Sequence, residues 1–253
     1  MAPTAKYLTL PAFTLTAYAG TPLYRARKIE SAAEIRHPAD VWEPPPAYVR
    51  SAGRLNLPGE SLLYTAADPL TALHEIRLQP GEMFALFQYE VQNDFRLTSL
   101  GRRSIETKQN GFTLNEEKKL KIIQDFVEDV FTQRAEPEAA HVYMGPQIIA
   151  KEYFDLPPHL SNGWAYRSVV DPSEKALNAC LRPESAHELL SLVVVTIGWC
   201  RREGDLVIAE TNSTPFSRDG IKALVTFDLT ARGPNSRNTI AVFSDHIAVH
   251  SNL

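Results

Sequence analysis

The clearest periodic pattern in the chain lies between Asn115 and Arg134 and predicts an amphipathic helix. Apolar residues recur there every three or four positions, while lysines and acids fill the remaining positions, as expected for a helix with one buried face. The apolar residues are Leu120, Ile123, Phe126, Val127, Val130 and Phe131. A second helix is predicted from about Pro146 to Phe154, because the prolines at 157 and 158 cannot continue it.

Between residues 61 and 91 the pattern predicts a strand, a short helix and another strand. Residues 61–66 (SLLYTA) have strand character, and Asp68 followed by Pro69 forms a helix N-cap with proline at the first helical position. This helix is expected to run to about Leu78. Residues 84–91 (FALFQYEV) alternate in part and are rich in aromatic side chains, which favours a strand.

Strand-like runs dominate the C-terminal part of the chain. One covers residues 163–170, and the others are separated by Gly, Pro, Asn and Ser; they lie at 189–199, 205–210, 221–229 and 239–250. Helices and strands without regular alternation predict an α+β fold, not a doubly wound parallel sheet. We expect residues 1–188 to form the main domain and residues 189–253 to form a β-rich extension packed on it.

The apolar strands of this extension need partners. The run at residues 192–197 (LVVVTI) would invite aggregation as an open sheet edge, so it must pair within the domain or across a subunit interface. We therefore expect a homodimer.

Composition narrows the classes of function. The chain has 253 residues, 44% of them hydrophobic, which is enough for one large domain or a core with a smaller appendage. A net charge of −4 gives no global field that would attract nucleic acid or acidic membranes. No apolar run reaches the length of a membrane span, and the N-terminus lacks a basic segment followed by a long apolar block. A cytoplasmic protein is expected.

Metal and phosphate-loop motifs are not found in the sequence. Two cysteines, Cys180 and Cys200, are too few for a four-cysteine zinc site, and we expect both to be buried and reduced. His74 and Glu75 begin an H-E-x-x-H pattern, but the second histidine position holds Leu78. The glycine-rich nucleotide-binding motifs G-x-G-x-x-G and G-x-x-x-x-G-K-[ST] do not occur in the sequence. Any nucleotide must therefore be held by side chains.

Three polar stretches are the candidates for chemistry: residues 23–27 (LYRAR), residues 53–75 (GRLNLPG through LLYTAADPLTALHE) and residues 163–168 (GWAYRS). Together they resemble the RES-domain family, which is named for an arginine, a glutamate and a serine. The resemblance covers roughly residues 20 to 185, and its middle segment is the specific part. The matching residues are Arg25, Arg54, Tyr64, Glu75 and Ser168.

The resemblance implies a fold related to ADP-ribosyltransferase toxins, with mixed or antiparallel sheets and flanking helices. It also implies an enzyme that consumes NAD, often a toxin neutralised by an antitoxin protein. Cleavage of NAD between nicotinamide and ribose requires that anions be bound and that a transient cation be stabilised. Arginine binds phosphate oxygens through its planar fork, and a carboxylate beside the ribose opposes the growing positive charge.

These demands assign roles to individual residues. Glu75 is the catalytic carboxylate, and Arg54 and Arg25 are the candidates for binding phosphate. Ser168 would contact a phosphate or position the incoming nucleophile. The binding residues are completed by Tyr64, for stacking and orienting nicotinamide, and by Tyr24 and Asn178. Trp164 and Tyr166 are expected to be packing residues.

The acceptor is not determined by the sequence. Water or phosphate would make the protein an NAD glycohydrolase or an NAD phosphorylase, whereas a protein side chain would make it an ADP-ribosyltransferase. A non-catalytic module that binds a nucleotide or an antitoxin is the alternative from a different functional class.

Overall fold

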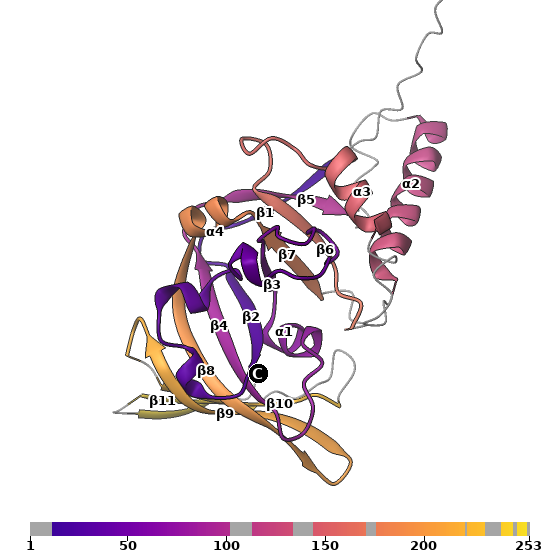
Figure 1. Ribbon diagram of the computed structural model, residues 1–253. Coiled ribbons are helices and arrows are strands. Elements are labelled where there is room, and N and C mark those ends of the chain that lie inside the picture. The colour runs from indigo at the N-terminus through magenta and orange to yellow at the C-terminus, as the bar shows by residue number, and fades with distance from the viewer. Residues whose placement is uncertain are drawn as a thin grey trace, which may run out of the picture.

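The protein is an α+β fold built on one large, strongly twisted sheet (Figure 1). The computed structural model describes residues 12–101, 113–133, 144–170, 176–220, 222–230, 239–244 and 247–251. Within these residues twelve strands form one sheet in the order β1-β5-β6-β7-β3-β2-β4-β8-β9-β10-β11-β12. Neighbouring strands are antiparallel except β5 and β6, which are parallel. The predicted α+β class is confirmed, and its relation to ADP-ribosyltransferases stays a prediction.

The bounds of the elements follow. The strands are β1 (Phe13–Ala17), β2 (Pro22–Ile29), β3 (Leu63–Ala66), β4 (Met83–Val91), β5 (Phe95–Leu100), β6 (Gly163–Arg167), β7 (Leu177–Leu181), β8 (Leu190–Glu203), β9 (Leu206–Ser217), β10 (Lys222–Asp228), β11 (Thr239–Ser244) and β12 (Ile247–Ser251). The α-helices of the described part are α1 (Pro69–Glu75), α2 (Leu114–Thr132), α3 (Met144–Tyr153) and α4 (Pro183–Leu189), and short 3-10 helices cover Ala32–Glu34, Pro38–Val41 and Pro46–Tyr48.

Helix α1 begins where the sequence predicts. Oδ1 of Asp68 accepts a hydrogen bond of 2.8 Å from the backbone N–H of Thr71, as an N-cap does. The helix ends at Glu75, before the predicted Leu78, because Arg77 has a positive φ of 49°. A residue in the left-handed region terminates an α-helix, and Glu75 therefore lies in the last turn.

Helix α2 confirms the predicted amphipathic pattern with one exception. Thr113 and Glu116 form a reciprocal capping box at its N-terminus, and Leu120, Val127 and Phe131 are buried. Phe126 was predicted to face the core, but it is 58% exposed. At about 100° per residue, Phe126 lies beside the stripe that contacts the sheet and not on it.

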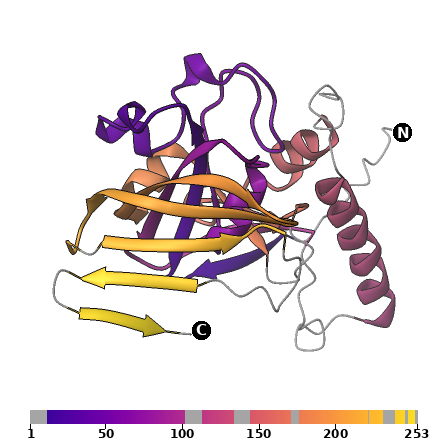
Figure 2. The same cartoon turned by 90° about the horizontal axis from the view of Figure 1, so that it is seen from below.

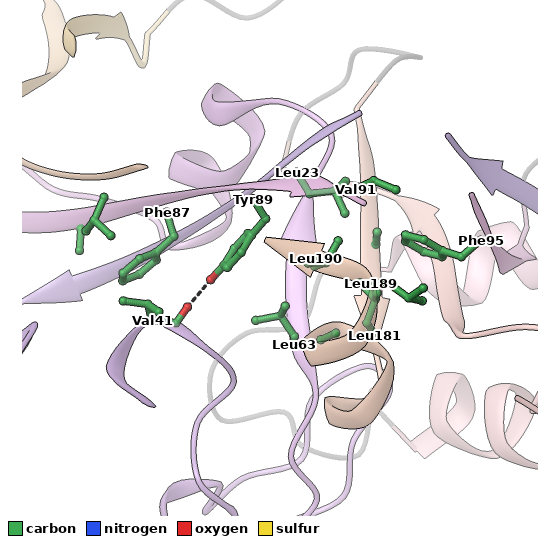
Figure 3. Close-up of a cluster of buried hydrophobic side chains, with 14 of the residues drawn as sticks. Leu23, Val41, Leu63, Phe87, Tyr89, Val91, Phe95, Leu181, Leu189 and Leu190 are labelled. Carbon is green, nitrogen blue, oxygen red and sulfur yellow. Dashed lines mark hydrogen bonds between the residues drawn. The ribbon is translucent and has the colours of Figure 1, made fainter. Parts of the chain in front are cut away.

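The core divides into three clusters on the two faces of the sheet. The largest cluster contains Leu23, Phe87 and Tyr89. The buried hydroxyl of Tyr89 donates a hydrogen bond to the carbonyl of Val41 (Figure 3). A second cluster packs the sheet against α2 and α3, and a third packs it against α1. Both cysteines are free and buried, as predicted.

The C-terminal strands continue the sheet. β8 pairs with β4 on one side and with β9 on the other, so the apolar run 192–197 is protected within the chain. The argument for a homodimer therefore no longer applies, and the homodimer stays an untested prediction. Strands β9 to β12 lie at the opposite end of the molecule from α2 and α3 (Figures 1 and 2). The division at residue 188 also stays a prediction, although the sheet itself is continuous across it.

Several elements were not predicted from the pattern. The most important is β2, which carries the LYRAR stretch and lies in the middle of the sheet between β3 and β4. Arg25, Arg27 and Lys28 make this strand hard to recognise in the sequence, because a central strand is usually apolar. Among the described residues, no helix is long and apolar enough to cross a membrane.

Candidate active site

A cavity of about 290 Å³ lies where β2 and β3 separate. Among the described residues, these two strands pair only at Tyr24, which lies opposite Ala66. The wall is built from β2, β3, α1, the loop before β3, and the adjoining strands β6 and β7. The lining residues are Tyr24, Arg25, Ala26, Gly53, Arg54, Asn56, Tyr64, Thr65, Ala66, Ala72, Glu75, Ile76, Tyr166 and Asn178. Of the seven site residues predicted from the sequence, all but Ser168 line this cavity.

Glu75 is held from one side by two donors. The hydroxyl of Ser168 lies 2.7 Å from Oε1 of Glu75, and Nδ2 of Asn178 lies 2.6 Å from the same oxygen. No described residue donates a hydrogen bond to Oε2. The carboxylate is therefore fixed in orientation through one oxygen, while the other remains available to a ligand.

Ser168 acts on the cavity through Glu75. Its side chain is only 5% exposed and does not line the cavity. It follows β6 directly, and its hydroxyl accepts a hydrogen bond of 3.3 Å from the backbone N–H of Val170. This geometry favours a positioning role for Ser168 over direct contact with phosphate or nucleophile.

The guanidinium of Arg54 contacts the C-terminal end of α2. Nη1 donates to the carbonyl of Phe131, and Nη2 lies 2.8 Å from the carbonyl of Gln133. The last carbonyls of a helix have no intrahelical donors and carry partial negative charge, so a cation is favourable there. Helix α2 thus orients the arginine that lines the cavity.

Gln147 of α3 fixes the loop that carries Arg54. Its Nε2 donates to the carbonyls of Gly53, at 2.7 Å, and Asn56, at 2.8 Å. Gly53 itself must lack a side chain, because a Cβ there would lie 2.3 Å from Oδ1 of Asn56. The loop before β3 is therefore held closely against the cavity by contacts from distant parts of the chain.

Arg25 lies in the wall on β2, between Tyr24 and Ala26, and its side chain points to the opposite face of the sheet from theirs. Its guanidinium carbon lies 5.4 Å from the centre of the Phe87 ring, and its Nη1 is buried with no hydrogen-bond partner among the described residues. Burial lowers the pKa of this guanidinium, while the neighbouring Tyr89 opposes the shift. The guanidinium of Arg25 therefore packs against Phe87 and Tyr89, within the largest of the core clusters.

The tyrosines of the wall are neutral phenols. Burial raises the pKa of Tyr24, Tyr64 and Tyr166, and the charge of Glu75 adds to the shift at Tyr166. The hydroxyl of Tyr64 donates a hydrogen bond of 2.8 Å to Oδ1 of Asn56 and accepts one from Leu55. This hydroxyl therefore positions the arginine loop, and the Tyr64 ring is the part left for a ligand.

Three residues of the site were missed or undervalued in the sequence. Tyr166 was expected only to pack, yet it lines the cavity; the period of two along a strand, which puts 166 and 168 on one face, was the available signal. Asn56 lies within the GRLN stretch but received no role. Gln147 had no local signal, because its contacts are to a loop more than ninety residues away.

Among the described residues, no group of three or more histidines, cysteines, aspartates and glutamates lies close enough to hold a metal ion. The polar residues that line the cavity are two arginines, one glutamate, two asparagines, three tyrosines and one threonine. They can bind anionic oxygens and stabilise a positive charge without a metal ligand.

The family model of the RES domain matches residues 22–201. The chain belongs to the RES-domain family. The match covers every predicted site residue and the greater part of β8. RES domains are a family of toxin enzymes whose members act on NAD. A search of curated proteins found no match to this chain.

Proposed function

We propose that this RES-domain protein degrades NAD by cleaving the bond between nicotinamide and ribose, with water or phosphate as the acceptor. The observation that carries the proposal is that Glu75 and Arg54 line one cavity of about 290 Å³, with Arg25 on the strand at its wall. This chemistry requires a carboxylate beside the positively charged nicotinamide riboside and cationic groups beside the diphosphate. Glu75, which two donors hold, meets the first requirement, and the two arginines meet the second.

The bond between C1 of the ribose and the pyridinium nitrogen breaks with its electron pair, and nicotinamide leaves as a neutral molecule. The ribose carbon acquires positive charge, which the carboxylate of Glu75 stabilises through charge and through a hydrogen bond from a ribose hydroxyl to Oε2. An oxygen of water or phosphate then bonds to C1. A water acceptor yields ADP-ribose and a proton, and phosphate yields ADP-ribose carrying a new phosphate at C1.

The remaining groups bind and orient the substrate. Arg25 and Arg54 bind the diphosphate oxygens, and the rings of Tyr64 and Tyr24 form stacking surfaces for nicotinamide. We further propose that the activity is that of a cytoplasmic toxin and that an antitoxin protein neutralises it. Family membership supports both statements.

Product analysis tests the proposal. The purified protein is incubated with NAD alone, with NAD and phosphate, and with NAD and a candidate acceptor protein, and the products are identified by mass spectrometry. Free nicotinamide together with ADP-ribose or its phosphorylated form is the expected result. A mass gain on the acceptor protein would instead identify an ADP-ribosyltransferase, and intact NAD in all three reactions would identify a non-catalytic module.

A further inference from the structure

The cavity that contains Glu75 is small for a whole dinucleotide. Its volume of about 290 Å³ lies at the lower end of the range of about 300–1,000 Å³ that is typical of ligand pockets. It can enclose the nicotinamide riboside half of NAD, whose reacting bond must lie beside Glu75. The adenosine half therefore needs a separate surface.

A second cavity of about 230 Å³ adjoins the first. The two share three lining residues, Gly53, Asn56 and Tyr64, so the wall between them is one loop and one side chain thick. The second cavity continues along residues 44–52, the segment that precedes Gly53 in the chain. Gly53, Asn56 and Tyr64 pack closely against one another, so a ligand that occupies both cavities would cross the outer rim of this wall.

The second cavity has the composition of a nucleoside site. Tyr48 is 73% exposed and lines this cavity beside Val49, and the buried Leu62 also lines it. An exposed aromatic ring beside an apolar surface can stack on a nucleobase, because every base offers a flat π-face.

The charges around the second cavity favour an anionic linker. Arg50 lines it and makes no ion pair with any described residue, whereas the carboxylate of Glu60 is neutralised by Lys151 of α3. Arg50 and Arg54 lie on either side of Gly53 in the chain and line the second and the first cavity, respectively. A diphosphate that crosses at Gly53 would therefore lie between two guanidinium groups.

We propose that this second cavity binds the adenosine half of the dinucleotide, with the adenine ring on Tyr48 and the diphosphate between Arg50 and Arg54. The inference rests on NAD as the substrate of the first cavity. It explains why the loop at Gly53 is fixed so closely by Gln147, since that loop carries contacts to both halves of the ligand.

Two probes separate the halves of the ligand. ADP carries adenosine and a diphosphate but no nicotinamide, and nicotinamide mononucleotide carries the other half. The dissociation constant of each is measured by calorimetry for the wild-type protein, Tyr48→Ala and Arg50→Ala. We expect each substitution to weaken ADP binding about tenfold, as for loss of one stacked base or one charged contact, and to leave binding of nicotinamide mononucleotide unchanged.

Matched controls exclude a general effect of surface substitution. Tyr18→Ala removes an aromatic ring that is 64% exposed, and Arg36→Ala removes an exposed cation; neither residue lines either cavity. The proposal is overturned if ADP does not bind the wild-type protein, if Tyr48→Ala and Arg50→Ala leave ADP binding unchanged, or if the binding of both probes weakens equally.

NAD turnover is measured on the same samples. ADP binding that depends on Tyr48 without NAD cleavage would refute the proposed function alone, and cleavage with Tyr48-independent ADP binding would refute the second site alone.

Discussion

The hydroxyl of Ser168 lies 2.7 Å from Oε1 of Glu75, although 93 residues separate the two in the chain. One residue follows β6 and the other ends α1, so the contact joins the sheet to the helix that covers it. Since Asn178 of β7 donates to the same oxygen, the glutamate and the serine of the sequence pattern correspond to a carboxylate held in one orientation.

Replacement of Glu75 by Gln should abolish most turnover while NAD still binds. The substitution keeps the shape of the side chain but removes the charge that stabilises the transition state, so we expect kcat to fall by about 10²- to 10³-fold. Turnover is measured by nicotinamide release, and the dissociation constant of NAD by calorimetry. Glu188→Gln, at an exposed acid outside the cavity, serves as the control. Turnover like that of the wild-type protein in Glu75→Gln would refute the catalytic role.

Replacement of Ser168 by Ala should lower kcat with little change in KM. Glu75 would lose one of its two donors, while the residues that bind the substrate would remain. A decrease of about tenfold is expected for one hydrogen bond to a charged group, and Ser168→Thr, which keeps a hydroxyl, should recover part of it. An increase in KM at constant kcat would instead indicate that Ser168 binds the substrate directly.

Arg54→Ala should weaken NAD binding about 10- to 100-fold, because a charged hydrogen-bonding partner of the diphosphate is lost. Arg54→Lys should not restore it, since an ammonium group lacks the planar fork that also spans the carbonyls of Phe131 and Gln133. Binding is measured in the Glu75→Gln background so that NAD is not consumed. Unchanged affinity in Arg54→Ala would locate the phosphate site elsewhere.

Gln147→Ala should reduce both stability and substrate affinity. The residue is 8% exposed. Its loss leaves the carbonyl of Gly53 without a donor, at a cost of about 1–3 kcal/mol, whereas the carbonyl of Asn56 keeps the N–H of Gly53 as a donor. Urea unfolding measures the first effect, and the KM for NAD measures the second. Gln92→Ala, at an exposed position, should change neither. A stability loss without any change in KM would show that the loop keeps its position without Gln147.

The stability of the protein should fall in alkaline solution, in part through Tyr89. Burial raises the pKa of this phenol to about 12, so the folded state keeps a proton that the unfolded chain loses above about pH 10. Its contribution is complete below about pH 10 and is lost as the pH rises toward 12, with a slope of up to about 1.4 kcal/mol per pH unit.

Tyr89→Phe removes this contribution, and the dependence of the free energy of unfolding on pH should become shallower. Urea unfolding between about pH 9 and pH 11 measures it. The variant is also less stable at neutral pH, because the hydrogen bond to the carbonyl of Val41 is lost. Tyr18→Phe, at an exposed position, is the control and should retain the slope of the wild-type protein. An equal slope in Tyr89→Phe would contradict the assignment.

The sequence predicted those helices and strands whose signals lie within a few neighbouring residues. The Asp68–Pro69 cap, the amphipathic stripe of α2 and the apolar runs of β4 and β8 each depend on residues a few positions apart. The same local stretches identified the family, since polar residues and turn residues within them occur at fixed spacing.

By itself, then, the sequence determined the α+β class, most of the helices and the residues proposed to carry the chemistry. Only the tertiary structure decided that β2 is a central strand, that β2 and β3 separate to form a cavity, and that α2 and α3 hold the arginine loop. The physical reason is that these contacts join residues far apart in the chain, 77 positions for Arg54 and Phe131 and 94 positions for Gly53 and Gln147. Such pairs are brought together by burial and strand pairing across the whole chain, and no local pattern encodes which of them will meet.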